Sequence, residues 1–71
     1  MIKEFDTVAL NEDLPGTSLY AGAEGAVVMV YNDGGAYEVE FFSSDGRTIA
    51  VETIEAYKVH QITYSKLAYK R

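Results

Sequence analysis

The feature that most restricts the fold is a pair of glycine turns on either side of one short alternating segment. Residues 32–35 (Asn-Asp-Gly-Gly) and 43–46 (Ser-Ser-Asp-Gly) each contain an Asp-Gly pair. Asp and Gly readily take the positive φ angles that tight hairpin turns require. Residues 36–42 between them alternate apolar and polar side chains, which is the period of a half-buried β-strand. The middle of the chain is therefore predicted to form two successive β-hairpins.

The rest of the chain supplies further short strands and the segments that join them. A fourteen-residue connection, residues 11–24, contains Pro15, Gly16 and Gly22 and is not expected to be regular. Residues 53–57 are long enough only for a single 3₁₀-like turn. Five short strands, a long first loop and a 3₁₀ turn before the last strand are the connectivity of an SH3-like barrel, so the predicted fold is all-β. The predicted strands are residues 5–10, 25–31, 36–42, 47–52 and 58–62.

Length and charge divide the chain into a body and a tail. Seventy-one residues make one domain, with the barrel in residues 1–62. That body holds all eleven acidic residues against three basic ones, a net charge of −8, whereas residues 63–71 carry a net charge of +3. The apolar residues of this basic C-terminal tail fall at helical spacing, so we expect it to be either helical or packed on the barrel.

The same charge distribution restricts the partners. A strongly acidic body repels phosphate backbones, so nucleic acid is an unlikely partner, and a protein with a basic surface is the expected one. Self-association through the outer sheet face or the tail remains open. The chain has no cysteine and no signal-like or long apolar segment, which predicts a cytoplasmic protein that does not enter a membrane.

Strand register follows from parity, because opposite residues of an antiparallel pair share a face. We pair Tyr31 with Ala36 and Phe42 with Thr48, which keeps Glu38 and Glu40 out of the core. The predicted inner layer is Ala26, Val28, Val30, Tyr37, Val39, Phe41, Ile49 and Val51. The opposite face mixes apolar, aromatic and acidic side chains, as protein interfaces do. The predicted partner-binding residues on it are Val27, Met29, Tyr31, Glu38, Glu40, Phe42 and Glu52.

Catalytic and metal sites are not expected. His60 is the only histidine and no cysteine accompanies it, so transition-metal ligands are lacking. Glu38 and Glu52 are predicted neighbours, but on a convex sheet that leaves no pocket for a substrate. The two Asp-Gly segments lack the context of calcium or phosphate loops. A proline-rich peptide groove would need stacked aromatics, and only Tyr20 and Tyr57 are placed for one. We therefore predict no enzyme activity and no cofactor.

Several stretches resemble the bacterial domain of unknown function 4926 family, over roughly residues 2–60. The resemblance lies in Phe-Asp-Thr-Val-Ala-Leu (5–10), Asp-Leu-Pro (13–15), Ala-Gly-Ala-Glu-Gly-Ala-Val-Val (21–28), Tyr-Glu-Val-Glu-Phe (37–41) and Thr-Ile-Ala-Val (48–51). The family implies an SH3-like barrel and no established activity. Its association with operons that encode a toxin-like or nuclease-like neighbour implies an antitoxin or immunity role, without assigning residues.

The expected function is a non-enzymatic acidic protein-binding module, antitoxin-like or immunity-like, that masks a basic site on a bacterial partner. A small structural or docking subunit of a larger complex is one alternative. Residues 22–30 are also similar to the KOW stretch of ribosomal and transcription-factor barrels. An RNA-binding barrel of that type is the second alternative, and the charge of the body disfavours it.

Overall fold

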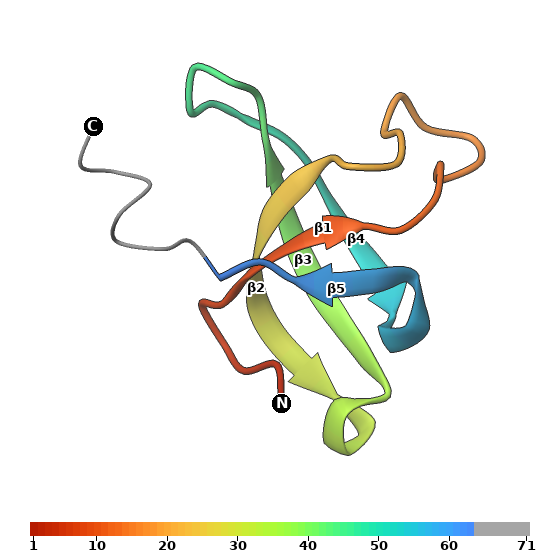
Figure 1. Cartoon of the computed structure of the whole chain (residues 1–71), viewed down its shortest axis with the longest axis vertical. Helices are drawn as coiled ribbons and strands as arrows, with labels where there is room; N and C mark the ends of the chain where they lie inside the picture. Colours follow the sequence, from red (N-terminus) through yellow and green to blue (C-terminus); the bar gives the residue numbers. More distant parts are fainter. Residues whose placement is uncertain (64–71) are drawn as a thin grey trace.

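The computed structural model describes residues 1–63 and contains five strands and two 3₁₀ turns (Figure 1). All strand pairs are antiparallel and belong to one sheet. This confirms the all-β, five-stranded fold. Of the predicted tail, only Thr63 lies within the described residues. The elements are β1 (Thr7–Leu10), β2 (Glu24–Tyr31), η1 (Asn32–Gly34), β3 (Ala36–Phe42), β4 (Thr48–Glu55), η2 (Ala56–Lys58) and β5 (Val59–Gln61).

The sheet curls so that its two ends enclose a core. Its strand order is β4-β3-β2-β1-β5, and Figure 1 shows β1 and β5 crossing in front of β3 and β4. The long strand β2 runs through both layers, pairing with β1 along its first half and with β3 along most of its length. The turn η2 then carries the chain from one end of the sheet to the other, from β4 to β5.

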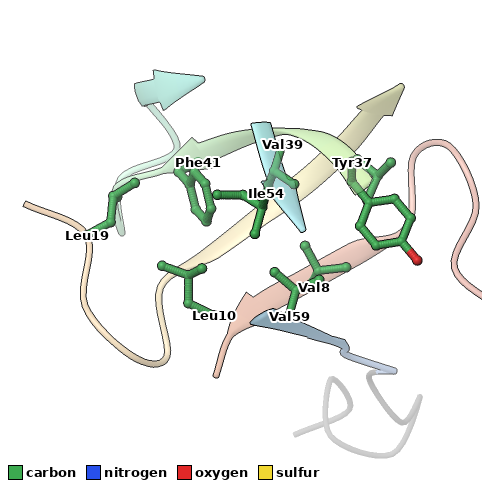
Figure 2. Packing of buried hydrophobic residues seen from close by; sticks show 9 residues of the cluster. Val8, Leu10, Leu19, Tyr37, Val39, Phe41, Ile54 and Val59 are labelled. Carbon is green, nitrogen blue, oxygen red and sulfur yellow. The ribbon is translucent and has the colours of Figure 1, made fainter. Parts of the chain in front are cut away.

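The core is formed by side chains from every strand and from one loop (Figure 2). The sequence analysis did not place Leu19 there, but the long first connection buries it. The Leu14 amide donates to the Leu19 carbonyl at 2.9 Å, and the Thr17 hydroxyl bonds the Leu14 carbonyl and the Leu19 amide. The loop is thereby folded over one end of the core. The buried cluster is Val8, Leu10, Leu19, Val27, Tyr37, Val39, Phe41, Ile54 and Val59.

A β-bulge in β2 changes the predicted register of the first hairpin. Tyr31 lies opposite Ala36 and Val30 opposite Tyr37, as predicted. Beyond Met29 the register shifts by one residue, and Val27 rather than Val28 lies opposite Val39. Val27 is therefore fully buried, and its predicted place on the outer face is wrong. Ala26 lies opposite the outward Glu40, so its predicted place in the inner layer is wrong as well. An extra residue in one strand reverses the face of every residue beyond it.

A second bulge does the same in β4. Phe42 lies opposite Thr48 as predicted, but Ala50, not Ile49, lies opposite Phe41. Ile49 and Val51 are thereby left about half exposed, so their predicted place in the inner layer is wrong. Glu52 lies opposite Val39 on the side that faces the core, so its predicted place on the outer face is wrong as well.

The strand β4 also runs further than predicted. The sequence analysis ended it at residue 52 and placed a turn at 53–57. Instead β4 continues to Glu55, and the 3₁₀ turn occupies Ala56–Lys58. The extension places Ile54 opposite Tyr37, where it is buried in the core. That burial stabilises the longer strand, because a fully buried isoleucine contributes about 1.5–3 kcal/mol.

Gly25 fixes how closely β2 approaches β3. A Cβ atom at this position would lie 2.5 Å from the Glu40 carbonyl oxygen and 2.8 Å from Val39 Cγ1. No side chain fits there, so glycine allows the two backbones to pack at the point where β2 passes from one layer to the other. The contact also fixes the backbone of Glu40, whose side chain points to the side of the sheet that faces away from the core.

Candidate functional site

The candidate site is the convex side of β2, β3 and β4, which we term the outer face. Alternate residues of a strand point to opposite sides of a sheet. Because Tyr37, Val39 and Phe41 of β3 are buried in the core, the residues between them point outward. The strand pairing then sets their neighbours on β2 and β4. The outer face comprises Met29, Tyr31, Glu38, Glu40, Phe42, Thr48, Val51 and Thr53, with Ile49 at its bulged border.

Glu38 is held at the centre of this face by two hydroxyl groups. Its Oε1 atom accepts hydrogen bonds from Tyr31 Oη at 3.1 Å and from Thr53 Oγ1 at 2.9 Å. The hydrogen bond to the carboxylate raises the pKa of Tyr31, and desolvation and repulsion from Glu38 add to the shift. The three side chains come from three adjacent strands, so the carboxylate is fixed relative to the whole sheet.

Glu40 is the second outward carboxylate, two residues further along β3. It accepts a hydrogen bond from Thr48 Oγ1 and lies between Ala26 of β2 and Val51 of β4. Both carboxylates are half-buried. Residues at i and i+2 of a strand are about 7 Å apart, so the outer face presents two negative charges at that spacing along one line.

Apolar side chains surround the two carboxylates. The exposed fractions are 47% for Met29, 38% for Phe42, 53% for Ile49 and 51% for Val51. Beside Phe42 the surface is hollowed by a cavity of about 400 Å³, lined also by Gly22, Glu24, Ser43 and Ser44. Exposed apolar groups grouped around fixed polar ones are characteristic of protein interaction sites.

The structure brings together five of the seven predicted site residues. Met29, Tyr31, Glu38, Glu40 and Phe42 lie on the outer face, whereas Val27 and Glu52 lie on the inner side for the reasons given above.

Sequence reasoning missed Ile49, Val51 and Thr53 as residues of the face. One signal was available, since Thr53 and Ile54 are β-branched and favour a continued strand over a turn. The bulge that exposes Ile49 and Val51 left no comparable signal.

His60 and Tyr57, which the sequence analysis also considered as site residues, form hydrogen bonds within the fold. His60 Nδ1 lies 2.5 Å from Asn11 Oδ1, and Asn11 Nδ2 donates to the Tyr57 carbonyl at 3.0 Å. These bonds attach the first loop to η2 and β5. Tyr20 and Tyr57 are exposed, and the Tyr57 hydroxyl donates to Glu55 Oε1 at 3.0 Å, which raises the pKa of Tyr57.

Residues 1–63 were also compared with the requirements of a metal site, a ligand cavity and a membrane-spanning helix. This part of the chain contains no group of three His, Asp or Glu side chains placed to hold a metal ion. A cavity of about 570 Å³ lies between the first four residues and the η1 turn, lined by Val30, Asp33 and Gly34 as well. In the same residues, no helix has the length and apolar character needed to cross a membrane.

Comparison with known proteins identifies one family. A family model described as "Domain of unknown function (DUF4926)" matches residues 4–61, which include all five strands. No curated protein and no solved structure matches the chain.

Proposed function

The chain belongs to the DUF4926 family. We propose that it is a non-enzymatic protein-binding module whose outer face binds a basic site on a bacterial partner. The family carries no assigned activity, so the proposal depends on one observation. Two half-buried carboxylates, Glu38 and Glu40, are held in place by hydroxyl groups in the middle of an exposed apolar surface. An antitoxin-like or immunity-like accessory protein in the cytoplasm is the role that such a module would fill.

Fixed carboxylates favour binding because little side-chain freedom remains to be lost. Burying and ordering a long side chain at an interface costs about 0.5–1.5 kcal/mol. The bonds from Tyr31 and Thr53 already restrict Glu38, and the bond from Thr48 restricts Glu40. A basic group that approaches them forms a charge-assisted hydrogen bond, which is stronger than a neutral one.

The apolar neighbours add the non-specific part of the binding energy. Removing exposed apolar surface from water contributes roughly 25 cal/mol per Å². Met29 and Phe42 are large side chains, and both are exposed by more than a third. Met29 lies opposite Glu38 on β2, and Phe42 lies two residues beyond Glu40 on β3, so a partner that covers both also covers the two carboxylates.

The double substitution M29S/F42S tests the proposal. Proteins captured from a lysate of the native host by the wild-type chain should be lost, because the apolar surround is removed while the barrel core stays intact. The matched control is Y20S/Y57S, which removes two exposed aromatic rings away from the outer face and should leave capture unchanged. Equal capture by wild type and M29S/F42S would contradict the proposal.

The salt dependence of binding to a captured partner gives a second test. Electrostatic complementarity mainly raises the association rate, and salt screens it. The association rate should fall as salt is raised, and E38Q/E40Q should reduce both that rate and its salt dependence. An affinity that is independent of salt would argue against carboxylate recognition.

A further inference from the structure

We infer that the partner docks as an extended basic strand added to the free edge of β4, with lysine or arginine at alternating positions facing Glu38 and Glu40. This inference depends on the proposed function for its charge preference. It goes further by naming the backbone surface that is used and the spacing of the basic groups that is recognised.

The first observation is that β4 is a long strand with one side unpaired in the part of the chain that the structure describes. It lies at the end of the strand order and pairs only with β3 among residues 1–63. It is eight residues long, whereas β5 at the other end of the sheet has three. An unpaired edge offers backbone N–H and C=O groups for pairing with another extended chain.

The second observation is the composition of this edge. Exposed edges are commonly protected by lysine or other charges, by proline, by bulges or by shortness. β4 (Thr-Ile-Ala-Val-Glu-Thr-Ile-Glu) has no lysine or proline, its bulge is confined to Ile49, and its only charges are acidic. Its charged residues are Glu52 and Glu55, and the half-exposed Ile49 and Val51 lie along it. The edge is therefore suited to pairing, and it carries negative charge.

That charge decides between a second copy of this chain and a different partner. Two copies joined at β4 would bring Glu52 and Glu55 of one copy beside those of the other, with Glu38 and Glu40 one strand away on each side. Like charges opposed across strands destabilise a sheet, and each copy carries a net charge of −5. A basic strand instead brings positive charge to the outward carboxylates Glu38 and Glu40.

Strand geometry sets the position of the basic side chains. An added strand lies about 4.8 Å from β4, and its outward side chains recur about every 7 Å. Val51 lies opposite Glu40 and Thr53 opposite Glu38, so outward residues of the added strand lie beside Val51 and Thr53. A lysine there can place its alkyl stem on Val51 while its ammonium group reaches toward Glu40.

The bulge at Ile49 marks one end of the docking site. A bulge interrupts regular pairing and bends the strand. The register with β3 is regular from Ala50 to Glu55, so the added strand should pair along those residues. Ile49 then covers the end of the docked segment.

Synthetic peptides test this with the full chain. The probe is a short peptide in which lysine alternates with valine, compared with one of the same composition whose lysines are adjacent and with a copy that carries proline at its centre. The alternating peptide should bind at least tenfold more tightly than either by fluorescence anisotropy. It should also slow hydrogen exchange of amides in β4. Proline should abolish binding because it cannot donate to the sheet.

The substitution V51K tests the edge from the side of the protein. The new lysine lies opposite Glu40 and occupies the place of the incoming basic group, so peptide binding should fall at least tenfold. An opposite-charge pair across strands is favourable, and the barrel should remain folded. The matched control is Y20K, which adds the same charge at an exposed position of the first loop and should leave affinity within about twofold.

The outcomes separate this inference from the proposed function. Equal affinity for all three peptides, or unchanged exchange in β4, overturns strand addition while leaving the outer face as a binding surface. Binding of the alternating peptide that is unaffected by E38Q/E40Q overturns the role of the carboxylates, and with it the proposed function. Self-association in sedimentation without peptide, relieved by V51K, overturns the inference in favour of a second copy.

Discussion

Strands β1 and β4 belong to the same sheet and differ in almost every other respect. β1 has four residues, pairs on both sides with β2 and β5, and three of its residues are buried. β4 has eight residues, has Ile54 as its one buried residue, and within residues 1–63 pairs on one side only. The comparison teaches that the short central strand contributes more to holding the barrel together, while much of the long edge strand is surface.

The difference follows from position in the sheet and not from composition. Both strands are rich in apolar residues, yet Val8 and Leu10 are buried whereas Ile49 and Val51 are about half exposed. A central strand is covered by the opposite layer, and an edge strand with a bulge turns part of its apolar surface away from the core. A small domain with a thin core can therefore still leave apolar groups available for a partner.

The largest expected effect comes from breaking the central strand. Leu10→Ala should lower the free energy of unfolding by about 2–5 kcal/mol, because it empties a fully buried site. Val51→Ala in β4 should lower it by less than about 1 kcal/mol, the span of strand propensities, because the side chain is about half exposed. Urea denaturation of both variants measures the contrast. Losses of similar size would show that the two strands contribute equally.

A smaller loss is expected where β2 approaches β3. Gly25→Ala should cost about 1–3 kcal/mol, the usual cost of overpacking, because the new methyl group meets the Glu40 carbonyl oxygen at 2.5 Å. Gly35→Ala is the control, since its nearest atoms would lie at 3.4 Å and its φ of −78° suits alanine. Thermal unfolding should rank G25A well below G35A. Equal stability would mean that the backbones separate without cost.

The segment that leads into β1 should allow a small gain. Phe5 is exposed and has a φ of 73°, in the left-handed region that disfavours bulky residues. Its amide nevertheless donates to the Val27 carbonyl at 2.6 Å and extends the β1–β2 pairing. Phe5→Asn should raise the free energy of unfolding by up to about 1 kcal/mol, since asparagine tolerates this conformation.

The control for that gain is Tyr20→Asn, which removes an exposed aromatic ring from a position with negative φ. This variant should leave stability unchanged in the same urea titration. A loss of stability in F5N would show that the Phe5 ring contributes contacts that outweigh its backbone strain.

The smallest effect is a titration shift on the outer face. Glu38→Gln should lower the pKa of Tyr31 toward its ordinary value of about 10, because the carboxylate that favours the protonated phenol is removed. A pKa raised by folding contributes stability below the unfolded-state pKa, and that stability is lost as pH rises through the folded-state pKa. E38Q should therefore lose less stability than wild type above about pH 10.

Ultraviolet difference absorption of the tyrosines measures that shift. Tyr57 is the internal control, since its raised pKa comes from Glu55 and should persist in E38Q. An unchanged tyrosine titration curve in E38Q would show that the Tyr31–Glu38 hydrogen bond is absent in solution.

Much of the fold could be predicted because short alternating strands and glycine turns are local signals. The pairs Tyr31–Ala36 and Phe42–Thr48 were correct since each lies next to its hairpin turn, where the turn sets the register. Glu38 and Glu40 were correctly placed outward because burying two unpaired carboxylates would be very costly. These two residues carry most of the candidate site.

The errors arose where the residue pattern gives no preference. Val27 and Val28 have identical side chains, so hydrophobicity does not indicate which of them faces the core. Residues 49–51 are all apolar, so the pattern does not indicate which of them faces the core. The bulge places Ile49 and Val51 at the surface. Leu19 was missed because a loop has no periodicity from which burial can be inferred.

By itself, the sequence determined the five strands, the two hairpins and the direction of the β3 side chains, since all of these follow from local backbone preference and a two-residue period. Only the tertiary structure decided which valine enters the core, how far β4 extends, and which of its residues remain exposed. Those choices depend on how the two layers and the folded first loop fill one small core. That requirement is collective and cannot be read from any single segment.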